Sequence, residues 1–279
     1  MNLKALSYKL RKDIVDLVYT GKAGHIGGDM SVVEILVALY FSQMNVHADA
    51  PEDPDRDLFV MSKGHAVEAY YCVLAEKGFI NKDALFAGYN RFGSPFIGHP
   101  NNKIPGIEMN SGSLGHGLPV CVGMAKAAKM DRSERRVYTV MGDGELAEGS
   151  VWEGAMAAAH YKLDNLCAVI DRNGLQISGS TEAVMACGDL CARFESFGWY
   201  VINVQDGNDL DALIEALEEA KAFKGKPSVI IANTVKGKGS AVMEGKPQWH
   251  HKVPNEQEYL QIVCDLEQMQ EAMENEKGQ

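Results

Sequence analysis

The sequence predicts an α/β protein with a doubly wound, mostly parallel sheet that carries helices on both faces. Apolar runs typical of buried strands recur at 137–141, 166–171, 199–204 and 227–235. Helical patterns of similar length separate them, at 150–162, 189–198 and 208–223. Strands that alternate with such helices form βαβ units, whose strands run parallel. We find no internal repeat or low-complexity linker, so one domain across residues 1–279 is the simplest organisation.

Two sequence patterns predict where helices begin. Ser31 is followed three residues later by Glu34, and Ser150 is followed by Glu153. This is the spacing of a capping box, in which both side chains satisfy main-chain N–H groups of the first turn. We therefore expect one helix to begin at Ser31 and another at Ser150.

The last part of the chain predicts a separate helix, at about 255–276. One face of it is apolar and acidic residues lie opposite, which is typical of a helix that packs on its own domain or on a partner. The apolar stripe consists of Tyr259, Ile262, Val263, Leu266, Met269 and Met273.

Composition excludes several classes of function. The chain has 279 residues and a net charge of −11, which argues against a nucleic-acid or anionic-membrane partner, because both require a basic face. No apolar run approaches the ~20 residues of a membrane span, and the N-terminus lacks the pattern of a signal peptide. The six cysteines fit neither a zinc site nor a CxxC redox pair. Free thiols in a reducing cytoplasm are the expectation.

One long segment breaks the alternation of strands and helices. Residues 88–120 are rich in Gly, Pro, Asn and Ser. An irregular segment of this length inside a compact domain is usually functional, so we expect it to contribute to a site.

Polar side chains follow two successive strands. Gly142-Asp143-Gly144 comes directly after one strand, and Asn173 follows the next strand, thirty residues later. Because ligands bind at the carboxyl ends of parallel strands, both oxygens should meet at one edge if the strands are neighbours. Together with a main-chain carbonyl they form a hard-oxygen set suited to Mg²⁺ or Ca²⁺. With so few protein ligands, Mg²⁺ would be completed by phosphates, and the two glycines leave the main chain open to a diphosphate.

Five stretches of the sequence resemble the N-terminal half of transketolases. The GDG and Asn pair is similar to the thiamine diphosphate motif of that family. The other four stretches are "GHIGGDMS" (24–31), "SKGHA" (62–66), "GHP…PGIEMNSGSLGHGLPVCVGMA" (98–125) and "KGKGSAVMEGKPQWHHKVPN" (236–255). They stand in the family's order and span nearly the whole chain.

The resemblance implies a cofactor, thiamine diphosphate, and a metal, Mg²⁺, for which Ca²⁺ or Mn²⁺ could substitute. It implies that Asp143, Asn173 and the carbonyl of Leu175 bind the metal. The implied cofactor contacts are His65, Gly112, Leu114, Gly142, Gly144, Asn173, Ile177 and His250. In this set Leu114 and Ile177 would flank the thiazolium ring, and Gly112 would lie against the aminopyrimidine. From the residues alone, Leu114 and Ile177 are equally well explained as core.

The resemblance further implies that His25, His99 and His250 face the donor ketose. Imidazole titrates near neutrality, so it can take and return the proton of a sugar hydroxyl. His250 and His251 are adjacent, and His250 is preferred because it follows the tryptophan. His116 is assigned no catalytic role. Glu148 would join a glutamate network between subunits.

Other residues stay open at this stage. Lys236 and Lys238 form either a phosphate-facing loop or a solvated turn, and Trp152 is most simply core.

Half of a transketolase site is absent from this sequence. The family's pyrimidine-binding domain, which completes the cofactor site, has no counterpart here. The chain therefore resembles the N-terminal, diphosphate-binding subunit of a split transketolase, inactive alone. A second subunit with the pyrimidine-binding and C-terminal domains would complete it, as an α₂β₂ heterotetramer. The expected reaction moves a two-carbon ketol unit from a ketose phosphate to an aldose phosphate, as in the pentose phosphate pathway.

Several alternatives remain. The ketose could differ and could even be sulfonated. The α chain of a 2-oxo-acid dehydrogenase would share GDG and Asn but not the histidine motifs, and half of a deoxyxylulose phosphate synthase is a further variant. A dinucleotide-binding oxidoreductase would need a third glycine that "GDGELAEG" lacks. A protein that only binds a partner would not need the Asp143 and Asn173 pair.

Overall fold

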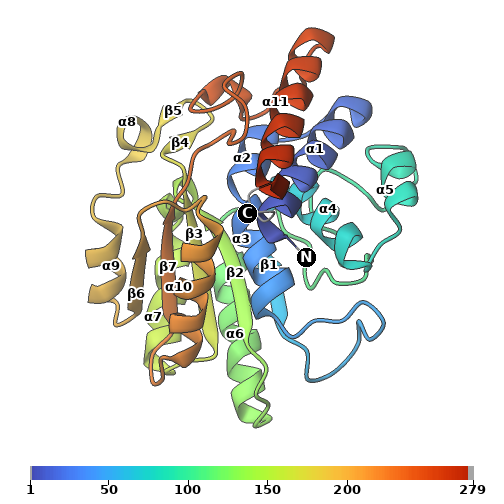
Figure 1. Cartoon of the computed structure of the whole chain (residues 1–279). Helices are drawn as coiled ribbons and strands as arrows, with labels where there is room; N and C mark the ends of the chain where they lie inside the picture. Colours follow the sequence, from blue (N-terminus) through green and yellow to red (C-terminus); the bar gives the residue numbers. More distant parts are fainter. Residues whose placement is uncertain (1, 276–279) are drawn as a thin grey trace.

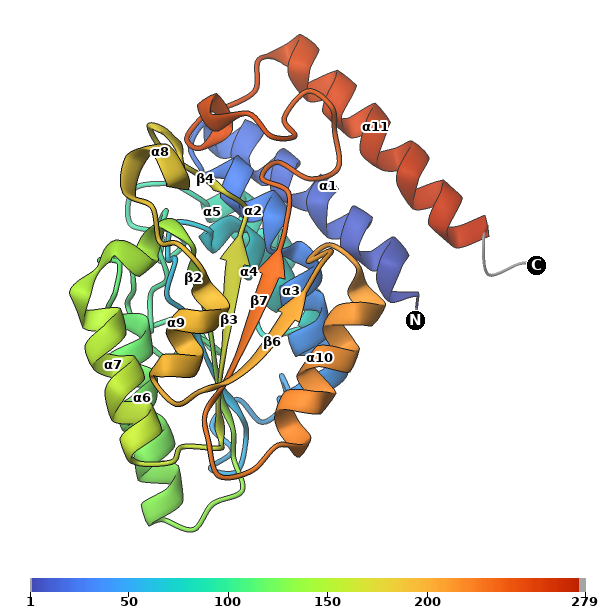
Figure 2. The ribbon, with the colours of Figure 1, turned by 90° about the vertical axis from the view of Figure 1, so that its left-hand side faces the viewer.

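The computed structural model describes residues 2–275, which form a five-stranded parallel sheet between two layers of helices (Figures 1 and 2). The strands lie in the order β1-β2-β3-β7-β6, and every neighbouring pair is parallel. Their bounds are β1 Leu58–Met61, β2 Val137–Gly142, β3 Leu166–Arg172, β6 Tyr200–Val204 and β7 Ser228–Asn233. The predicted fold class is thus confirmed, although sequence analysis did not identify β1.

Side chains of the central strands alternate between two cores, one on each face of the sheet. In β2, Tyr138 and Val140 belong to one core, and Val137 and Met141 belong to the other. Strands buried on both faces read as continuous apolar runs, which is why these segments were recognisable in the sequence.

The helical layers differ in composition. One contains α6 (Gly117–Met130), α7 (Gly149–His160) and α9 (Leu190–Ser196). The other contains α1 (Leu3–Gly21), α3 (Val33–Ala38), the π-helical turn Leu39–Gln43, α4 (Val67–Lys77) and α10 (Leu210–Ala222). The remaining elements are α2 Ile26–Ser31, α5 Lys82–Gly88, the 3₁₀ turns Gly144–Ala147 and Pro247–Trp249, the hairpin β4 Leu175–Gln176 and β5 Gly179–Ser180, α8 Thr181–Met185, and α11 Glu256–Asn275.

Neither predicted capping box forms. Ser31 ends α2, and its hydroxyl donates to the Asp171 carboxylate at 2.7 Å and to the carbonyl of Gly28 at 3.1 Å. Ser150 lies inside α7, and its hydroxyl donates to the carbonyl of Gly115 at 2.9 Å. Both serine hydroxyls thus donate hydrogen bonds to segments distant in the sequence, instead of capping the first turn of a helix.

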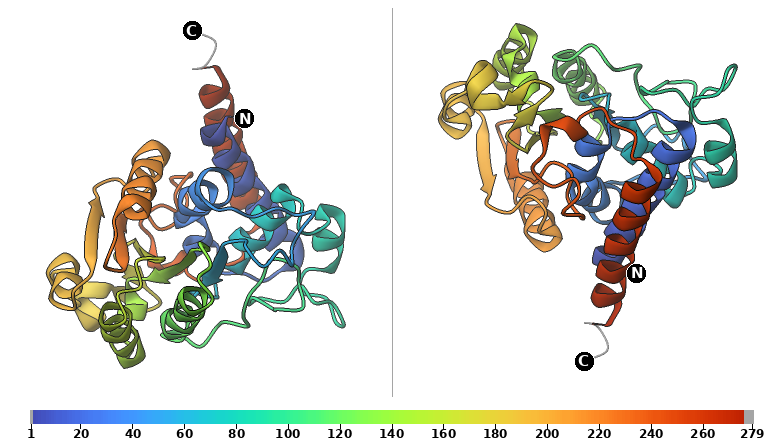
Figure 3. Two further views of the ribbon diagram at one scale, coloured as in Figure 1. Left: turned by 90° about the horizontal axis from the view of Figure 1, so that it is seen from below. Right: turned by 90° about the horizontal axis from the view of Figure 1, so that it is seen from above.

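The C-terminal helix α11 lies along α1 (Figure 3). Ile262 and Leu266 are buried, and the ring of Tyr259 stacks on that of Tyr19 with centroids 4.2 Å apart. The predicted stripe is therefore only partly covered, since Met269 is 44% exposed. The predicted end of this helix, residue 276, lies outside the described residues.

Two glycines of α6 provide a test of the packing of this helix. A Cβ added at Gly117 would lie 2.3 Å from Ser62 Oγ, whereas one added at Gly123 would meet nothing within 4 Å. We expect Gly117→Ala to destabilise the chain by about 1–3 kcal/mol through overpacking. The matched variant Gly123→Ala should be neutral or stabilising by up to about 1 kcal/mol, because alanine favours helix. Urea unfolding of both variants measures the difference, and equal effects would contradict the packing.

The carboxyl ends of all five strands point to the same edge of the sheet, toward α8 and the β4–β5 hairpin (Figure 2). The segments that follow β1, β2, β3 and β7 are therefore the ones placed to build a site. None of the helices within residues 2–275 has the length and apolar character that crossing a membrane requires.

Candidate active site

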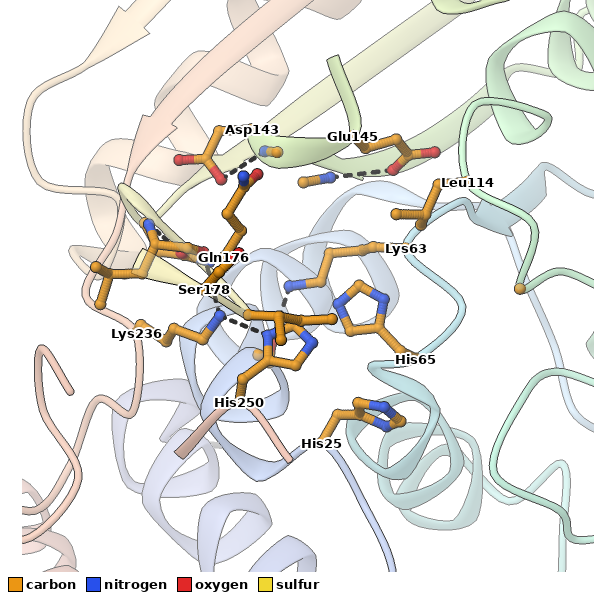
Figure 4. A pocket seen from close by; sticks show the side chains of 17 residues that line it. His25, Lys63, His65, Leu114, Asp143, Glu145, Gln176, Ser178, Lys236 and His250 are labelled. Atoms are coloured by element: carbon orange, nitrogen blue, oxygen red, sulfur yellow. Dashed lines mark hydrogen bonds between the residues drawn. The ribbon is translucent and has the colours of Figure 1, made fainter. Parts of the chain in front are cut away.

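A cavity of about 380 Å³ lies at the carboxyl edge of the sheet (Figure 4). Its lining contains all the predicted metal and cofactor residues, and two of the three predicted sugar-facing histidines. The residues are His25, Gly28, Lys63, His65, Gly112, Leu114, Gly142, Asp143, Gly144, Glu145, Asn173, Leu175, Gln176, Ile177, Ser178, Lys236 and His250. Figure 4 shows Asp143 and Glu145 on one side, with His25, His65 and His250 on the other. The predicted residues His99 and Glu148 do not line the cavity.

Asp143 is held by main-chain groups from two strand ends. One carboxylate oxygen accepts from the N–H of Gly144 at 2.9 Å, and the other accepts from the N–H of Gly174 at 2.7 Å. Burial, together with the negative charge of Asp171, raises the pKa of Asp143 to about 6. The charge of Lys63 offsets this only in part, so a bound cation would stabilise the ionised carboxylate.

Asn173 and Leu175 place two further oxygens near this carboxylate. Asn173 Oδ1 accepts from the N–H of Leu175 at 3.1 Å, and its Nδ2 donates to Asp171 at 3.1 Å. The carbonyl of Leu175 accepts from Lys236 Nζ at 3.1 Å. Each of these oxygens keeps a second lone pair, so both can still bind a cation.

Asp171 is the electrostatic centre beneath the site. It is fully buried at the end of β3 and forms an ion pair with Lys63 at 2.5 Å. Ser31, Thr234 and Asn173 also donate to it. Burial alone would raise the pKa of Asp171, but Lys63 and the hydroxyl donors outweigh burial and lower it. Asp171 thus stays ionised and neutralises one of the two cavity lysines.

Glu145 joins three segments of the cavity wall. Its buried carboxylate accepts from the hydroxyl of Ser62, from the N–H of Gly115 at 2.8 Å and from the N–H of Gly142 at 3.2 Å. These donors follow β1, precede α6 and end β2, respectively. A single carboxylate therefore sets the spacing of the segments that carry Leu114 and Asp143.

The histidines form a compact cluster. The ring centroid of His25 lies 5.4 Å from that of His65, 5.6 Å from that of His250, and 6.1 Å from that of His99. His99 is thus within reach of the cluster, although it stands behind Gly112. A Cβ at Gly112, where φ is +149°, would lie 2.8 Å from the His99 ring, so only glycine fits there.

The adjacent histidines 250 and 251 occupy different positions. His250 lines the cavity, and its Nδ1 lies 2.9 Å from Lys236 Nζ. His251 is outside the lining, with its ring 4.7 Å from that of His25. The structure therefore brings the preferred histidine to the cavity. His116 is exposed at the start of α6.

The lining is rich in nitrogen bases whose pKa values are lowered, and its histidines are neutral near pH 7. Burial and the neighbouring histidines and lysines lower the pKa of His25 to about 4, and burial and Lys236 lower the pKa of His250 to about 3. The pKa of His65 is also lowered, by burial and Lys63. For Lys236, burial and Lys63 lower the pKa to about 8. A polyanion bound here would favour protonation of all four groups.

The interpretations left open in the sequence are now decided by burial. Ile177 is 75% exposed at the cavity, so it is not a core residue. Lys236 is buried in the lining, whereas Lys238 lies 3.8 Å from Glu244 and is partly exposed. Trp152 is half-buried and packs against Phe194 at the border of one core, so the core expectation holds only in part. Glu148 is exposed where α7 begins, which leaves it accessible to a partner.

Sequence analysis did not single out five of the lining residues, namely Gly28, Lys63, Glu145, Gln176 and Ser178. Lys63 and Glu145 stand inside the transketolase-like motifs, so proximity to those motifs was an available signal. Gln176 and Ser178 belong to the short hairpin after Asn173, and they too stand inside the transketolase-like stretch that begins with GDG.

Comparison with known proteins agrees with this geometry. The family described as transketolase, thiamine diphosphate binding domain, matches residues 4–265. The chain is 48% identical to one subunit of the apulose-4-phosphate transketolase of Phocaeicola vulgatus, over 99% of this chain and 98% of the relative. It is 41% identical to one subunit of the 6-deoxy-6-sulfo-D-fructose transketolase of a Clostridium species, over 88% of each chain.

Solved structures of full transketolases contain the same fold. The Campylobacter jejuni enzyme superposes with a TM-score of 0.90 and 27% identity, over 97% of this chain and 43% of that one. The Leishmania mexicana enzyme gives 0.88 and 29%, over 99% of this chain and 45% of that one. This chain thus spans somewhat less than half the length of those enzymes. It belongs to the transketolase family and corresponds to the thiamine diphosphate-binding domain of its members.

Proposed function

We propose that this chain is the diphosphate-binding subunit of a two-chain transketolase, which transfers a two-carbon ketol unit from a ketose phosphate to an aldose phosphate. The observation that supports it most is the meeting of Asp143, Asn173 and Leu175 at one edge of a cavity lined by lysine and histidine. A 2-oxo-acid dehydrogenase chain does not account for the cluster of His25, His65 and His250.

The residues fit a diphosphate held through a divalent cation. Asp143, Asn173 and the Leu175 carbonyl offer one charged and two neutral oxygens, the type of ligand that Mg²⁺ prefers. Within residues 2–275 no group of three or more His, Cys, Asp or Glu is placed to hold a metal by itself. A Cβ at Gly142 would meet nothing within 4 Å, so the main chain there is open to a ligand. Lys63, Lys236, His65 and His250 supply positive or protonatable groups for the phosphates.

Thiamine diphosphate, when bound, supplies the carbon that carries the ketol unit between the two sugars. The chain's own residues would orient the cofactor and handle protons. Leu114 and Ile177 provide apolar contact for one ring, and Gly112 leaves room for the other. His25, His99 and His250, neutral near pH 7, can each accept a hydroxyl proton and return it later.

We assign the missing half of the site to a second protein chain that carries the pyrimidine-binding and C-terminal domains, in an α₂β₂ assembly. The names of the two relatives that are themselves transketolase subunits support this. Exposed Glu148 and the exposed apolar side chain of Ile177 are the residues we expect at the interface. We further infer a cytoplasmic location, since the six cysteines are free. The proposed transfer between sugar phosphates would belong to carbohydrate metabolism.

Purified chain with thiamine diphosphate and Mg²⁺ tests the proposal directly. Apulose 4-phosphate is the first donor to try, because a relative named for it covers this chain almost completely; xylulose and sedoheptulose phosphates are the next. We expect no transfer by the chain alone and transfer when the partner chain is added. Comparable transfer without a partner would refute the two-chain proposal, and tight binding of NADH in place of thiamine diphosphate would refute the enzyme class.

A further inference from the structure

Two carboxyl groups are buried outside the cavity, next to the segment that carries His25. Asp29 of α2 and Glu68 of α4 both have no exposed surface. Asp29 Oδ1 accepts from the N–H of Ala69 at 3.0 Å, and Glu68 Oε1 accepts from the hydroxyl of Tyr89. The second oxygen of each carboxyl group, Asp29 Oδ2 or Glu68 Oε2, accepts no hydrogen bond from an N–H or O–H group among the described residues.

The two carboxyl groups contact each other. Burial and the contact with Glu68 raise the pKa of Asp29, and burial also raises the pKa of Glu68 against the hydrogen bonds from Tyr89 and Asp29. Two adjacent carboxylates in a dry interior cannot both be ionised. A single proton between them would give each orphan oxygen a partner, as donor on one side and acceptor on the other.

Other ionisable groups around the pair do not replace that proton. Tyr89, Tyr71 and Cys72 face it and are neutral, because burial raises the pKa of each. Lys63 is the nearby cation that acts on Asp29, and it already forms the ion pair with Asp171. The pair therefore has no full counter-charge of its own.

The pair is bonded to the main chain of His25. The His25 N–H acts on the Glu68 carboxylate as a hydrogen-bond donor. On the other side, the His25 carbonyl accepts from the N–H groups of Gly28 at 2.9 Å and Asp29 at 3.1 Å. Glu68 also packs closely against Gly24, the residue before His25. A Cβ added at Gly24 would lie 3.2 Å from Glu68 Oε1.

We propose that Asp29 and Glu68 share one proton and together act as positioning residues, which hold the main chain of His25 so that its imidazole faces the cavity. The shared proton keeps the pair at a single negative charge and lets both carboxyl groups bond to helix α4 and to the His25 segment. Only the consequence for ketol transfer rests on the proposed function.

Carbon-13 NMR of the side-chain carboxyls in the wild-type chain tests the shared proton. Signals are assigned by their loss in Asp29→Asn and Glu68→Gln. We expect the two signals to titrate together, in two separated steps, with the last proton lost well above the pH at which an isolated carboxyl group ionises. Full ionisation of both groups by about pH 5 in the folded chain would refute the shared proton.

The positioning role is tested by the imidazole signals of His25, without cofactor or partner. Asp29→Ala and Glu68→Ala should raise the pKa of His25 from about 4 toward the unperturbed ~6.5. Asp29→Asn keeps the acceptor for Ala69 and donates to Glu68, so it should leave His25 unchanged. Glu76→Gln, on the same helix but paired with Lys9, is the matched control. Unchanged His25 titration in folded alanine variants would refute the positioning role.

Stability against pH provides a readout if an alanine variant does not fold. The pKa values of Asp29 and Glu68 are raised in the folded chain, so their contribution is complete below about pH 4 and is lost as the pH rises. Asp29→Asn should flatten this decline, and an unaltered profile would contradict the shared proton.

With the partner present, the alanine variants should lower kcat about tenfold or more. If the wild-type chain with its partner shows no ketol transfer, the proposed function is refuted. The NMR titration still tests whether Asp29 and Glu68 share a proton.

Discussion

Replacing Asp143 with asparagine is expected to weaken Mg²⁺-dependent binding of thiamine diphosphate by about 100-fold or more, since loss of even an indirect metal contact costs 10–100-fold. Asp143 is the one charged side chain among the three proposed metal ligands, and asparagine keeps its shape while removing the charge. Titration calorimetry with the chain, and with the chain plus partner, measures the loss. The same titration without Mg²⁺ should show little difference between variant and wild type.

This loss of binding should occur without loss of the fold. The pKa of Asp143 is raised to about 6 in the folded chain, so its ionisation weakens the metal-free protein as the pH rises from about 4 through 6. Asp143→Asn removes that loss and should be at least as stable as wild type at pH 7. The control is Asp189→Asn, the same change at an exposed carboxylate that caps α9. Wild-type affinity in the Asp143 variant would exclude the proposed metal site.

The largest loss of stability is expected for Asp171→Asn, at about 3–5 kcal/mol, the usual cost of removing one partner of a buried ion pair. The substitution leaves Lys63 buried without its counter-charge and disturbs the hydrogen bonds from Ser31 and Thr234. Because the folded pKa of Asp171 is lowered, its stabilisation is present at neutral pH and is lost as the pH falls below about 4.

Urea unfolding of the purified chain at pH 7 measures this cost. Glu76→Gln breaks the partly exposed ion pair with Lys9 and should cost no more than about 1 kcal/mol. If the two variants lose the same stability, the Lys63–Asp171 pair does not hold the ends of β1 and β3 together.

The strands and the proximity of Asp143 to Asn173 could be predicted because both follow from local pattern. Strands β2, β3 and β7 are continuous apolar runs, and parallel neighbours end at the same edge of a sheet. The helix starts at Ser31 and Ser150 could not be predicted correctly. Their hydroxyls bond to Asp171 and Gly115, which are distant in the sequence.

Other parts of the site depend on packing that no local pattern records. Lys63 reaches the cavity because Asp171 neutralises it, and Asp171 is itself inside an apolar strand. Glu145 reads as an ordinary acid after GDG, yet it binds three segments through Ser62, Gly115 and Gly142. The resemblance to transketolases supplied the histidines, whose positions in loops follow from tertiary structure alone.

The cavity draws its walls from His25 near one end of the chain and His250 near the other. Contacts between such remote segments form only after the intervening chain has been ordered, because closing long loops is entropically costly. During synthesis the pocket would thus be incomplete until the segment around His250 has left the ribosome. Thiamine diphosphate present at that time would stabilise the finished protein by binding to it, but it would have no complete site to bind during the early collapse of the chain.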